Sequence, residues 1–437
     1  MGIDALISRV TDIDPYYRLG RVSRVVGLMI ESKGPKASIG DLCKILIGRD
    51  HPPVYAEVVG FNDEHVLLMP YTNIHRIAPG CLVESTGRPL AIKVGDALKG
   101  RVLNGLGMPM DGGELPADLC EYSTHQPPPN PLDRPRIHSP LTVGIRSIDA
   151  LLTVGKGQRM GIFAGSGVGK STTLGMIARN TSADLNVIAL IGERGREVLE
   201  FIENDLGEEG LRRSVLVVAT SDQPALMRIK GALTATAIAE YFRAQGQDVL
   251  LMMDSLTRVA MAQREIGLAI GEPPTTKGYT PSVFALLPQL LERAGTSRDG
   301  SVTAFYTVLV DGDDLDEPIS DAARGILDGH IVLDRRLAEK GQYPAVNILK
   351  SISRVMTSIV SKEEREAANR FRNLLAQYEE ASDLIQIGAY KAGSSAEIDE
   401  AIRFYPSIIR FLKQDVTENV TRDAAVQQLL SEFGRGE

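Results

Sequence analysis

The chain has 437 residues, a length that predicts about three domains. Hydrophobic residues make up 43% of it and charged residues 24%, which is the composition of a folded globular protein and excludes disorder throughout. Its 48 basic and 56 acidic side chains give a formal net charge of −8, and this acidic balance argues against a general affinity for nucleic acid.

The chain carries no pattern typical of secretion, membrane spanning or covalent cross-linking. Its three cysteines, Cys43, Cys81 and Cys120, lie far apart without a CxxC pair, which predicts reduced thiols in a cytosolic protein. The first 20 residues carry three aspartates and no apolar core, so they do not resemble a secretory signal. No run reaches the ~18–20 apolar residues of a membrane helix, and we expect any membrane association to go through partners.

An amphipathic helix is predicted at the N-terminus, within residues 1–20. Ile3, Leu6, Ile7 and Val10 recur at helical spacing and share one face. A helix this short has no core of its own, so two interpretations stay open. Either the helix packs on the next domain, or it serves as a docking or assembly segment.

A β-rich region follows, which we place at residues 21–92. Residues 22–28, 54–59 and 65–69 form short apolar runs, and turn residues such as Gly and Pro separate them. Short strands at this spacing predict a small antiparallel barrel or sandwich. Further along, the proline-rich stretch 127–131 predicts an extended and exposed connector.

Residues 93–360 carry the pattern of an open α/β sheet. Apolar runs alternate with helical segments, and several runs are apolar throughout, which is typical of parallel strands covered on both faces. The predicted strands are 160–164, 187–191, 215–219, 249–253, 302–310 and 331–333, and the helices between them include 171–179, 225–243 and 281–293.

The remaining residues, 361–437, predict a small helical domain. Strand patterns stop there, and two capping boxes occur, each with a serine at the N-cap and a glutamate three residues later. The first box pairs Ser361 with Glu364, and the second pairs Ser394 with Glu397. Because a helical pattern follows each box, each is expected to begin a helix.

The strongest chemical pattern is a phosphate-binding loop in residues 164–171. The sequence fits the P-loop pattern except that Ala164 replaces the first glycine, and a tight turn tolerates alanine where φ is negative. Glycines let successive N–H groups surround an anion, and the following helix adds its positive end. We expect Lys170 to reach the β- and γ-phosphates and the Ser171 hydroxyl to bind Mg²⁺. A structural glycine turn is the weaker alternative, because a strand precedes this loop and a helix follows it.

Two carboxylates near the ends of later apolar strands complete this pattern. Asp254 ends the run 249–253 and is expected to act as the Walker B acid in the outer shell of the metal. Glu193 follows the run 187–191, where side chains of such a sheet point into the nucleotide crevice, so we expect it to orient and polarise the attacking water. Without the phosphate loop, Asp254 would be interpreted as an ordinary strand end, and Glu193 would be interpreted as a member of a surface Glu–Arg cluster.

Longer stretches of the chain form a familiar pattern around these residues. It consists of residues 144–149, the phosphate loop, the Gly-Glu-Arg of 192–194 and the Asp-Ser-Leu-Thr-Arg of 254–258. The pattern resembles the catalytic subunits of rotary ATP synthases, and more closely the type III secretion ATPase family. Residues 260–269 and 277–284 look like its flagellar export branch in particular. The resemblance covers nearly the whole chain and implies a RecA-like P-loop NTPase core between a small β-barrel and a C-terminal helical domain.

The resemblance also implies roles for single residues. Glu193 matches the family's catalytic glutamate, Arg194 the arginine beside it, and Asp254 the Walker B acid. Arg354 matches an arginine finger that reaches the γ-phosphate of a neighbouring subunit, and Tyr343 matches an aromatic residue that packs on adenine. From the residues alone, Arg354 would be an ordinary exposed arginine and Tyr343 a half-buried turn residue. The residues that match the phosphate loop are Gly165, Ser166, Gly167, Val168, Gly169, Lys170, Ser171 and Thr172.

The leading interpretation is therefore a cytosolic, Mg²⁺-dependent ATPase that energises flagellar type III protein export. Because the chain carries the catalytic glutamate itself, one type of chain supplies the whole site, which favours a homohexamer. The family implies further partners at the cytoplasmic membrane: a stator-like regulator, a stalk-like coiled-coil protein, the export gate, and complexes of chaperones with export substrates. No nucleic acid is expected among them.

Three alternatives accompany this interpretation. The ATPase of a virulence-type secretion apparatus shares the catalytic motifs, so the motifs hardly separate it from a flagellar enzyme. A hexameric RNA translocase also joins a small β domain to a related core, but residues 21–92 lack an aromatic–basic cluster and the net charge opposes it. An inactive ring scaffold is disfavoured, because Lys170, Glu193 and Asp254 are all present.

Overall fold

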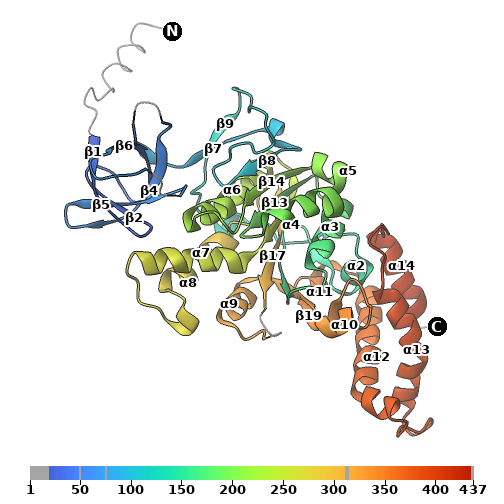
Figure 1. Ribbon diagram of the computed structural model, residues 1–437. Helices are drawn as coiled ribbons and strands as arrows, with labels where there is room; N and C mark the ends of the chain where they lie inside the picture. The colour runs from blue at the N-terminus through green and yellow to red at the C-terminus, as the bar shows by residue number, and fades with distance from the viewer. Residues whose placement is uncertain (1–18, 49–50, 74–75, 311–313, 435–437) are drawn as a thin grey trace.

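The computed structural model describes residues 19–48, 51–73, 76–310 and 314–434. Within them the chain forms a β-barrel, an α/β sheet covered by helices, and a C-terminal group of helices, as predicted (Figure 1). The barrel and the C-terminal helices lie at opposite ends of the molecule, with the sheet between them. The apolar face predicted for the N-terminal helix lies outside the described residues.

In the described part of the chain, six antiparallel strands close the barrel in the order β1-β2-β5-β4-β3-β6. Ile30, Val58 and Leu68 are fully buried in its interior, because one face of each strand points inward. Gly27 has a φ of 56° and turns the chain after β1, so this strand ends at Val26, two residues before the end of the predicted run 22–28. The strands are β1 (Leu19–Val26), β2 (Met29–Lys33), β3 (Asp41–Leu46), β4 (Val54–Asn62), β5 (His65–Pro70) and β6 (Leu82–Pro89).

Short pairings lead from the barrel into the sheet. Strand β7 (Ala91–Val94) pairs with β9 (Cys120–Ser123), and β10 (Pro140–Leu141) pairs with β11 (Val154–Gly155). The proline-rich connector lies between these pairs. Its residues 127–130 form neither helix nor strand and Pro127 and Pro128 are exposed, as predicted, whereas Pro129 is half-buried and Pro131 begins a short 3₁₀ helix (Pro131–Asp133).

Among the described residues, nine strands form the central sheet. Their order is β19-β18-β12-β17-β15-β13-β14-β8, and β16 pairs with β17 off this path. Neighbours from β18 to β8 run parallel, whereas β19 pairs antiparallel with β18 and forms one edge. The strands are β8 (Val102–Asn104), β12 (Arg159–Ala164), β13 (Leu185–Ile191), β14 (Ser214–Ala219), β15 (Asp248–Asp254), β16 (Gly295–Thr296), β17 (Ser301–Leu309), β18 (Gly329–Leu333) and β19 (Val346–Ser353).

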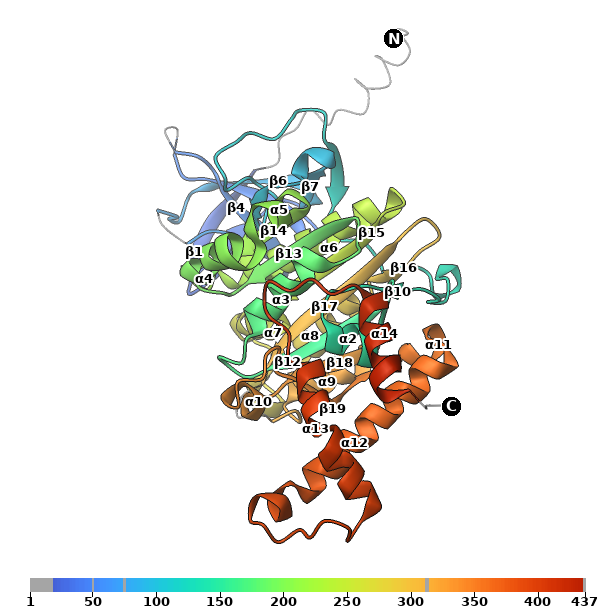
Figure 2. The same ribbon diagram turned by 90° about the vertical axis from the view of Figure 1, so that its right-hand side faces the viewer.

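Helices cover both faces of this sheet, which explains why central strands such as β13 are buried along their whole length (Figure 2). Val187, Ala189 and Ile191 of β13 join the core that contains α6, α7 and α8. Ile188 and Leu190 join the opposite core, with α2, α3 and the C-terminal helices. The helices are α2 (Arg146–Leu151), α3 (Lys170–Asn180), α4 (Gly195–Glu200), α5 (Gly207–Arg212), α6 (Ala225–Ala244), α7 (Leu256–Ala269), α8 (Pro281–Leu291), α9 (Pro318–Ile326), α10 (Arg335–Glu339) and α11 (Met356–Ile359).

The C-terminal helices are α12 (Lys362–Gln386), α13 (Ala396–Leu412) and α14 (Arg422–Phe433). Their shared core contains one aromatic ring from each helix. The ring centroid of Phe371 lies 5.4 Å from that of Phe411 and 4.8 Å from that of Phe433. These contacts join the three helices into one packed unit.

The two predicted helix starts differ in outcome. Ser361 is the N-cap of α12, and its hydroxyl accepts a hydrogen bond from the Glu364 N–H, as the capping box predicts. The second start was placed one residue too early, because Ser395 and not Ser394 caps α13. The Ser395 hydroxyl accepts from the N–H of Ile398, so no capping box forms there. Adjacent serines are equivalent caps in the sequence, and the local pattern could not choose between them.

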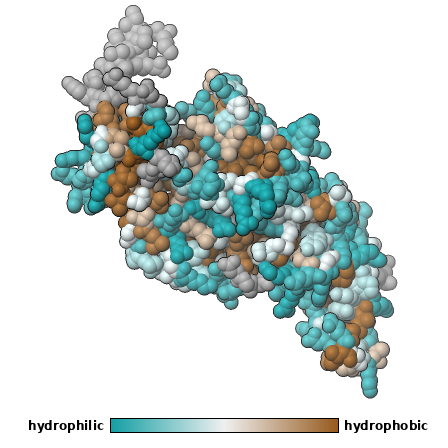
Figure 3. Space-filling view, viewed as in Figure 1, coloured by the Kyte–Doolittle hydropathy of each residue, from teal (hydrophilic) through white to brown (hydrophobic). Residues whose placement is uncertain are grey.

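Polar side chains dominate the face in Figure 3, while apolar side chains gather over the barrel and at the far end of the C-terminal helices. Exposed apolar residues include Val26 and Leu28 on the barrel and Leu384 and Ile387 at the end of α12. No helix in the described ranges combines the length and the apolar character that a membrane crossing requires.

Candidate active site

Strand β12, a glycine-rich turn and helix α3 build the phosphate loop. Gly167 and Gly169 have φ of 76° and 87°, a left-handed conformation that glycine adopts more readily than other residues do. Ala164 keeps the extended backbone of β12, so its position needs no glycine. The predicted loop residues all lie on this turn or in the first turn of α3: Gly165, Ser166, Gly167, Val168, Gly169, Lys170, Ser171 and Thr172.

Lys170, Glu193 and Asp254 meet beside this turn, although they come from three separate segments. The Nζ atom of Lys170 lies 2.6 Å from Oδ1 of Asp254 and 3.3 Å from Oε1 of Glu193. Strands β13 and β15 are parallel neighbours, so their carboxyl ends place the two carboxylates at one edge of the sheet. The structure therefore brings together the three residues on which the predicted chemistry depends.

Burial and charge set the protonation of this cluster. The side chains of Lys170, Glu193 and Asp254 are 13%, 16% and 6% exposed. Burial, followed by the charge of Asp254, raises the pKa of Glu193 above its ordinary value. Burial lowers the pKa of Lys170, but the attraction of Asp254 and Glu193 outweighs it, so the net shift is upward. The ammonium group therefore stays charged and offsets the repulsion between two carboxylates.

Two hydroxyl groups that the sequence did not point to support the cluster. Thr307 on β17 donates a hydrogen bond from Oγ1 to Oδ1 of Asp254 at 2.6 Å. Thr173 donates from Oγ1 to the carbonyl oxygen of Gly169 at 2.9 Å and so holds the first turn of α3. A polar residue within the apolar run 302–310 was the available indication for Thr307, but the register that sets it beside Asp254 is a long-range feature.

Arg194 and Arg354 lie outside this cluster. Arg194 is exposed and forms an ion pair with Glu197 at 3.1 Å, on the first turn of α4. Arg354 is exposed, as the sequence predicts, and it directly follows the edge strand β19, which the sequence analysis did not predict. Its guanidinium donates a hydrogen bond to the backbone carbonyl oxygen of Arg324 at 3.2 Å. Within the described ranges, no side chain forms a hydrogen bond or ion pair with it.

Tyr343 lies against the phosphate loop. Two of its ring carbons are 3.5 Å from the point where a Cβ atom on Gly169 would stand. The residue is 44% exposed, so part of the ring remains open to solvent at the start of α3. The structure thus places a partly exposed aromatic ring beside the phosphate loop, and the adenine contact that the resemblance implies stays a prediction.

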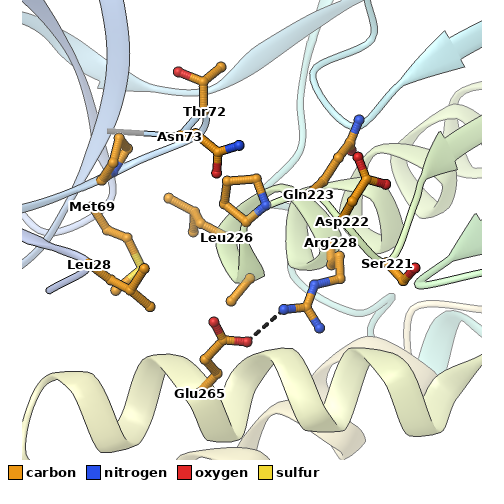
Figure 4. A pocket seen from close by; sticks show the side chains of 13 residues that line it. Leu28, Met69, Thr72, Asn73, Ser221, Asp222, Gln223, Leu226, Arg228 and Glu265 are labelled. Atoms are coloured by element: carbon orange, nitrogen blue, oxygen red, sulfur yellow. Dashed lines mark hydrogen bonds and ion pairs between the residues drawn. The ribbon is translucent and has the colours of Figure 1, made fainter. Parts of the chain in front are cut away.

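A cavity of about 260 Å³ lies between the barrel and the helices α6 and α7 (Figure 4). Leu28 and Met69 line it on the barrel side, and Arg228 pairs with Glu265 at 2.6 Å on the other side. None of the predicted site residues lines it. This cavity is therefore distinct from the phosphate loop.

Three family models match the chain. The β-barrel domain of the ATP synthase alpha/beta family matches residues 22–87, and the nucleotide-binding domain of the same family matches residues 144–353. The C-terminal domain of the T3SS EscN ATPase matches residues 360–431. The matches follow one another along the barrel, the sheet and the C-terminal helices.

Similar proteins match over nearly the full length. The chain is 64% identical over 438 residues to the flagellum-specific ATP synthase of Bacillus subtilis (strain 168), covering 100% of both chains. Its structure matches that of the assembled ATPase EscN from the enteropathogenic E. coli type III secretion system, with a TM-score of 0.90, 46% identity, and coverage of 95% of this chain and 100% of that chain. EscN in complex with its central stalk EscO matches with a TM-score of 0.88, at the same identity and coverage.

Proposed function

The chain belongs to the ATP synthase alpha/beta family and is a flagellum-specific ATPase of type III export, and we propose that it hydrolyses Mg²⁺–ATP in a homohexameric ring. The observation that carries the chemical part is the meeting of Lys170, Glu193 and Asp254 beside the phosphate loop. One chain supplies the loop, the candidate base and the Walker B acid, and a neighbouring copy of the same chain would complete the site.

The donor set at this loop fits Mg²⁺, which prefers oxygen ligands and keeps part of its water shell. Ser171 lies in the first turn of α3 with an exposed side chain, and its hydroxyl would bind the ion directly. Both hydrogen bonds that described residues give the Asp254 carboxylate end on Oδ1. Its second oxygen, Oδ2, would therefore accept a hydrogen bond from a water of the ion, and Asp254 would act in the outer shell. When bound, the ion neutralises charge on the phosphates.

Lys170 and Glu193 would change partners when nucleotide binds. The phosphates compete with both carboxylates for the ammonium group of Lys170, which the structure holds at hydrogen-bond distance from them. Once Lys170 turns to the phosphates, Glu193 is released to accept a hydrogen bond from the attacking water. Its raised pKa makes its carboxylate a better proton acceptor than an ordinary glutamate.

The remaining roles concern adenine and the neighbouring subunit. We assign Tyr343 to stacking on adenine, since its ring lies beside Gly169 and is partly open. Arg354 would serve as a finger for a neighbour's γ-phosphate, because within its own chain its guanidinium bonds only to a carbonyl oxygen among the described residues. Arg194 would assist from beside Glu193 once nucleotide is bound.

Domain roles and partners complete the proposal. Residues 1–20 would dock or assemble, 21–92 form the barrel domain, 93–360 the ATPase domain and 361–437 the helical domain. A stalk-like coiled-coil partner is supported by the complex of the similar EscN with its central stalk EscO. A stator-like regulator, the export gate and chaperone–substrate complexes are the other partners, and the enzyme would act in the cytoplasm at the membrane export apparatus.

Phosphate release measured with Mg²⁺ and with EDTA tests the proposal. Turnover should require Mg²⁺, and Asp254→Asn should lose most of it. Asp316→Asn, which changes an acid with a 90% exposed side chain, is the matched control and should keep wild-type turnover. Full activity in EDTA, or an Asp254→Asn variant as active as the control, would contradict the assigned chemistry.

A further inference from the structure

Thr307 lies on the strand between the two halves of the phosphate site. Strand β17 pairs with β12, which leads into the phosphate loop, and with β15, which carries Asp254. Thr307 stands opposite Ile162 of β12 in the parallel register, and its preceding residue stands opposite Met253 of β15. A side chain at this position therefore reaches the carboxyl end of the Walker B strand.

The hydroxyl of Thr307 donates its hydrogen bond to Asp254. Thr307 is 0% exposed and Asp254 4% exposed, so water does not readily replace a lost hydrogen bond between them. Oγ1 of Thr307 lies 2.6 Å from Oδ1 of Asp254 and 3.5 Å from the carbonyl oxygen of Met253. The carboxylate is thus much the closer acceptor.

One carboxylate oxygen of Asp254 receives two donors. Lys170 and Thr307 both contact Oδ1 at 2.6 Å. If Lys170 moves to the phosphates, Thr307 is the donor that remains on Oδ1. The terminal torsion of an aspartate is soft, so without this donor the carboxylate would rotate over a wide range.

We propose that Thr307 is a positioning residue that orients Asp254 toward the water shell of Mg²⁺ after Lys170 has turned to the phosphates. This inference rests on the proposed metal role of Asp254. Loss of the Thr307 hydroxyl should therefore weaken the Mg²⁺-dependent gain in nucleotide affinity. The affinity that the loop backbone provides without Mg²⁺ should stay the same. Outer-shell partners of this kind typically change metal affinity or activity by ~10–100-fold when they are removed.

The same strand offers a matched control. Thr303 is 1% exposed, and its hydroxyl accepts a hydrogen bond from the Gly157 N–H at 2.8 Å, away from the cluster. Thr303→Val and Thr307→Val thus remove the same group from the same buried strand. Both should lower the thermal unfolding temperature, and only the second should alter metal dependence.

Titration with N-methylanthraniloyl-ADP, once with Mg²⁺ and once with EDTA, gives the ratio of the two dissociation constants for each full-length variant. Thr307→Val should reduce the gain in affinity from Mg²⁺ by about 10-fold or more and leave the EDTA value unchanged. Thr307→Ser keeps the hydroxyl and should restore the gain. If the Thr307→Val variant does not fold, Thr307→Ala is measured in its place.

Two results would overturn the inference. One is an unchanged Mg²⁺ gain in Thr307→Val, and the other is an equal loss in Thr303→Val, which would reduce the effect to strand packing. If the nucleotide affinity of the wild-type protein is the same with Mg²⁺ and with EDTA, that result would instead contradict the metal role of Asp254. The failure of the inference and the failure of the proposed function are therefore separate outcomes.

Discussion

Replacing Glu193 by glutamine separates nucleotide binding from hydrolysis. The change keeps the size of the side chain and removes its charge. Glu193 lies 3.3 Å from the ammonium group of Lys170, but Asp254 is closer, at 2.6 Å. Because Lys170 keeps that closer partner, the phosphate loop should stay intact and the variant should still bind nucleotide.

The expected loss falls on the chemical step. A group that positions water or accepts its proton typically contributes ~10²–10⁴-fold to the rate. At 1.36 kcal/mol for each tenfold change, this loss corresponds to about 2.7–5.4 kcal/mol of activation free energy. The variant also loses the repulsion between Glu193 and Asp254, so its nucleotide affinity should be retained or improved.

Steady-state phosphate release and N-methylanthraniloyl-ATP binding measure the two steps separately. Glu200→Gln is the control, because Glu200 ends α4, the short helix that follows Glu193, has a side chain 55% exposed and pairs with Arg196 at 3.5 Å. The control should behave as wild type in both assays. Normal turnover of Glu193→Gln would refute the water-positioning role, and lost binding would mean that Glu193 shapes the phosphate loop.

Two further predictions concern adenine and the N-terminal segment. Tyr343→Ala should weaken nucleotide binding by about 10-fold, since stacking of a base on an aromatic ring is worth ~1–3 kcal/mol, whereas Tyr343→Phe should bind as wild type in the same titration. Equal affinities would remove Tyr343 from the adenine site. Deleting residues 1–18, the part of the predicted segment that precedes β1, should leave the thermal unfolding of the core unchanged and weaken binding of a stator-like partner in a pull-down. Unfolding, or unchanged assembly and binding, would favour packing over docking.

The phosphate loop was predictable because its geometry depends on consecutive residues. Positive φ at Gly167 and Gly169, and a helix that begins at Lys170, follow from a local pattern. Glu193 and Asp254 were predictable for a related reason. Residues near the carboxyl ends of neighbouring parallel strands reach one edge of the sheet, whatever the exact register.

Features that depend on long-range pairing were not predictable. The sequence left barrel and sandwich open for residues 21–92, because closure depends on β1 pairing with β6, which is distant in the chain. The contact of Thr307 with Asp254 likewise depends on the pairing of β15 with β17. The finger role that we propose for Arg354 involves a second subunit, so neither the sequence nor a single chain fixes the position of its target.

We propose that each site is completed by a neighbouring copy of the same chain. In a 1:1 mixture of Arg354→Ala and Lys170→Ala, about a quarter of the interfaces of a ring would join an intact loop to an intact finger. A finger of this kind is worth roughly 10³–10⁵ in rate, so neither variant alone should turn over appreciably.

Phosphate release from that mixture, followed as the protein concentration rises, is the most direct measurement. If neighbouring subunits share each site, the mixture should recover toward about a quarter of wild-type activity, and wild-type turnover should rise more steeply than linearly with protein concentration. No recovery in the mixture, together with turnover that is linear in protein concentration, would contradict both the finger role of Arg354 and the homohexamer.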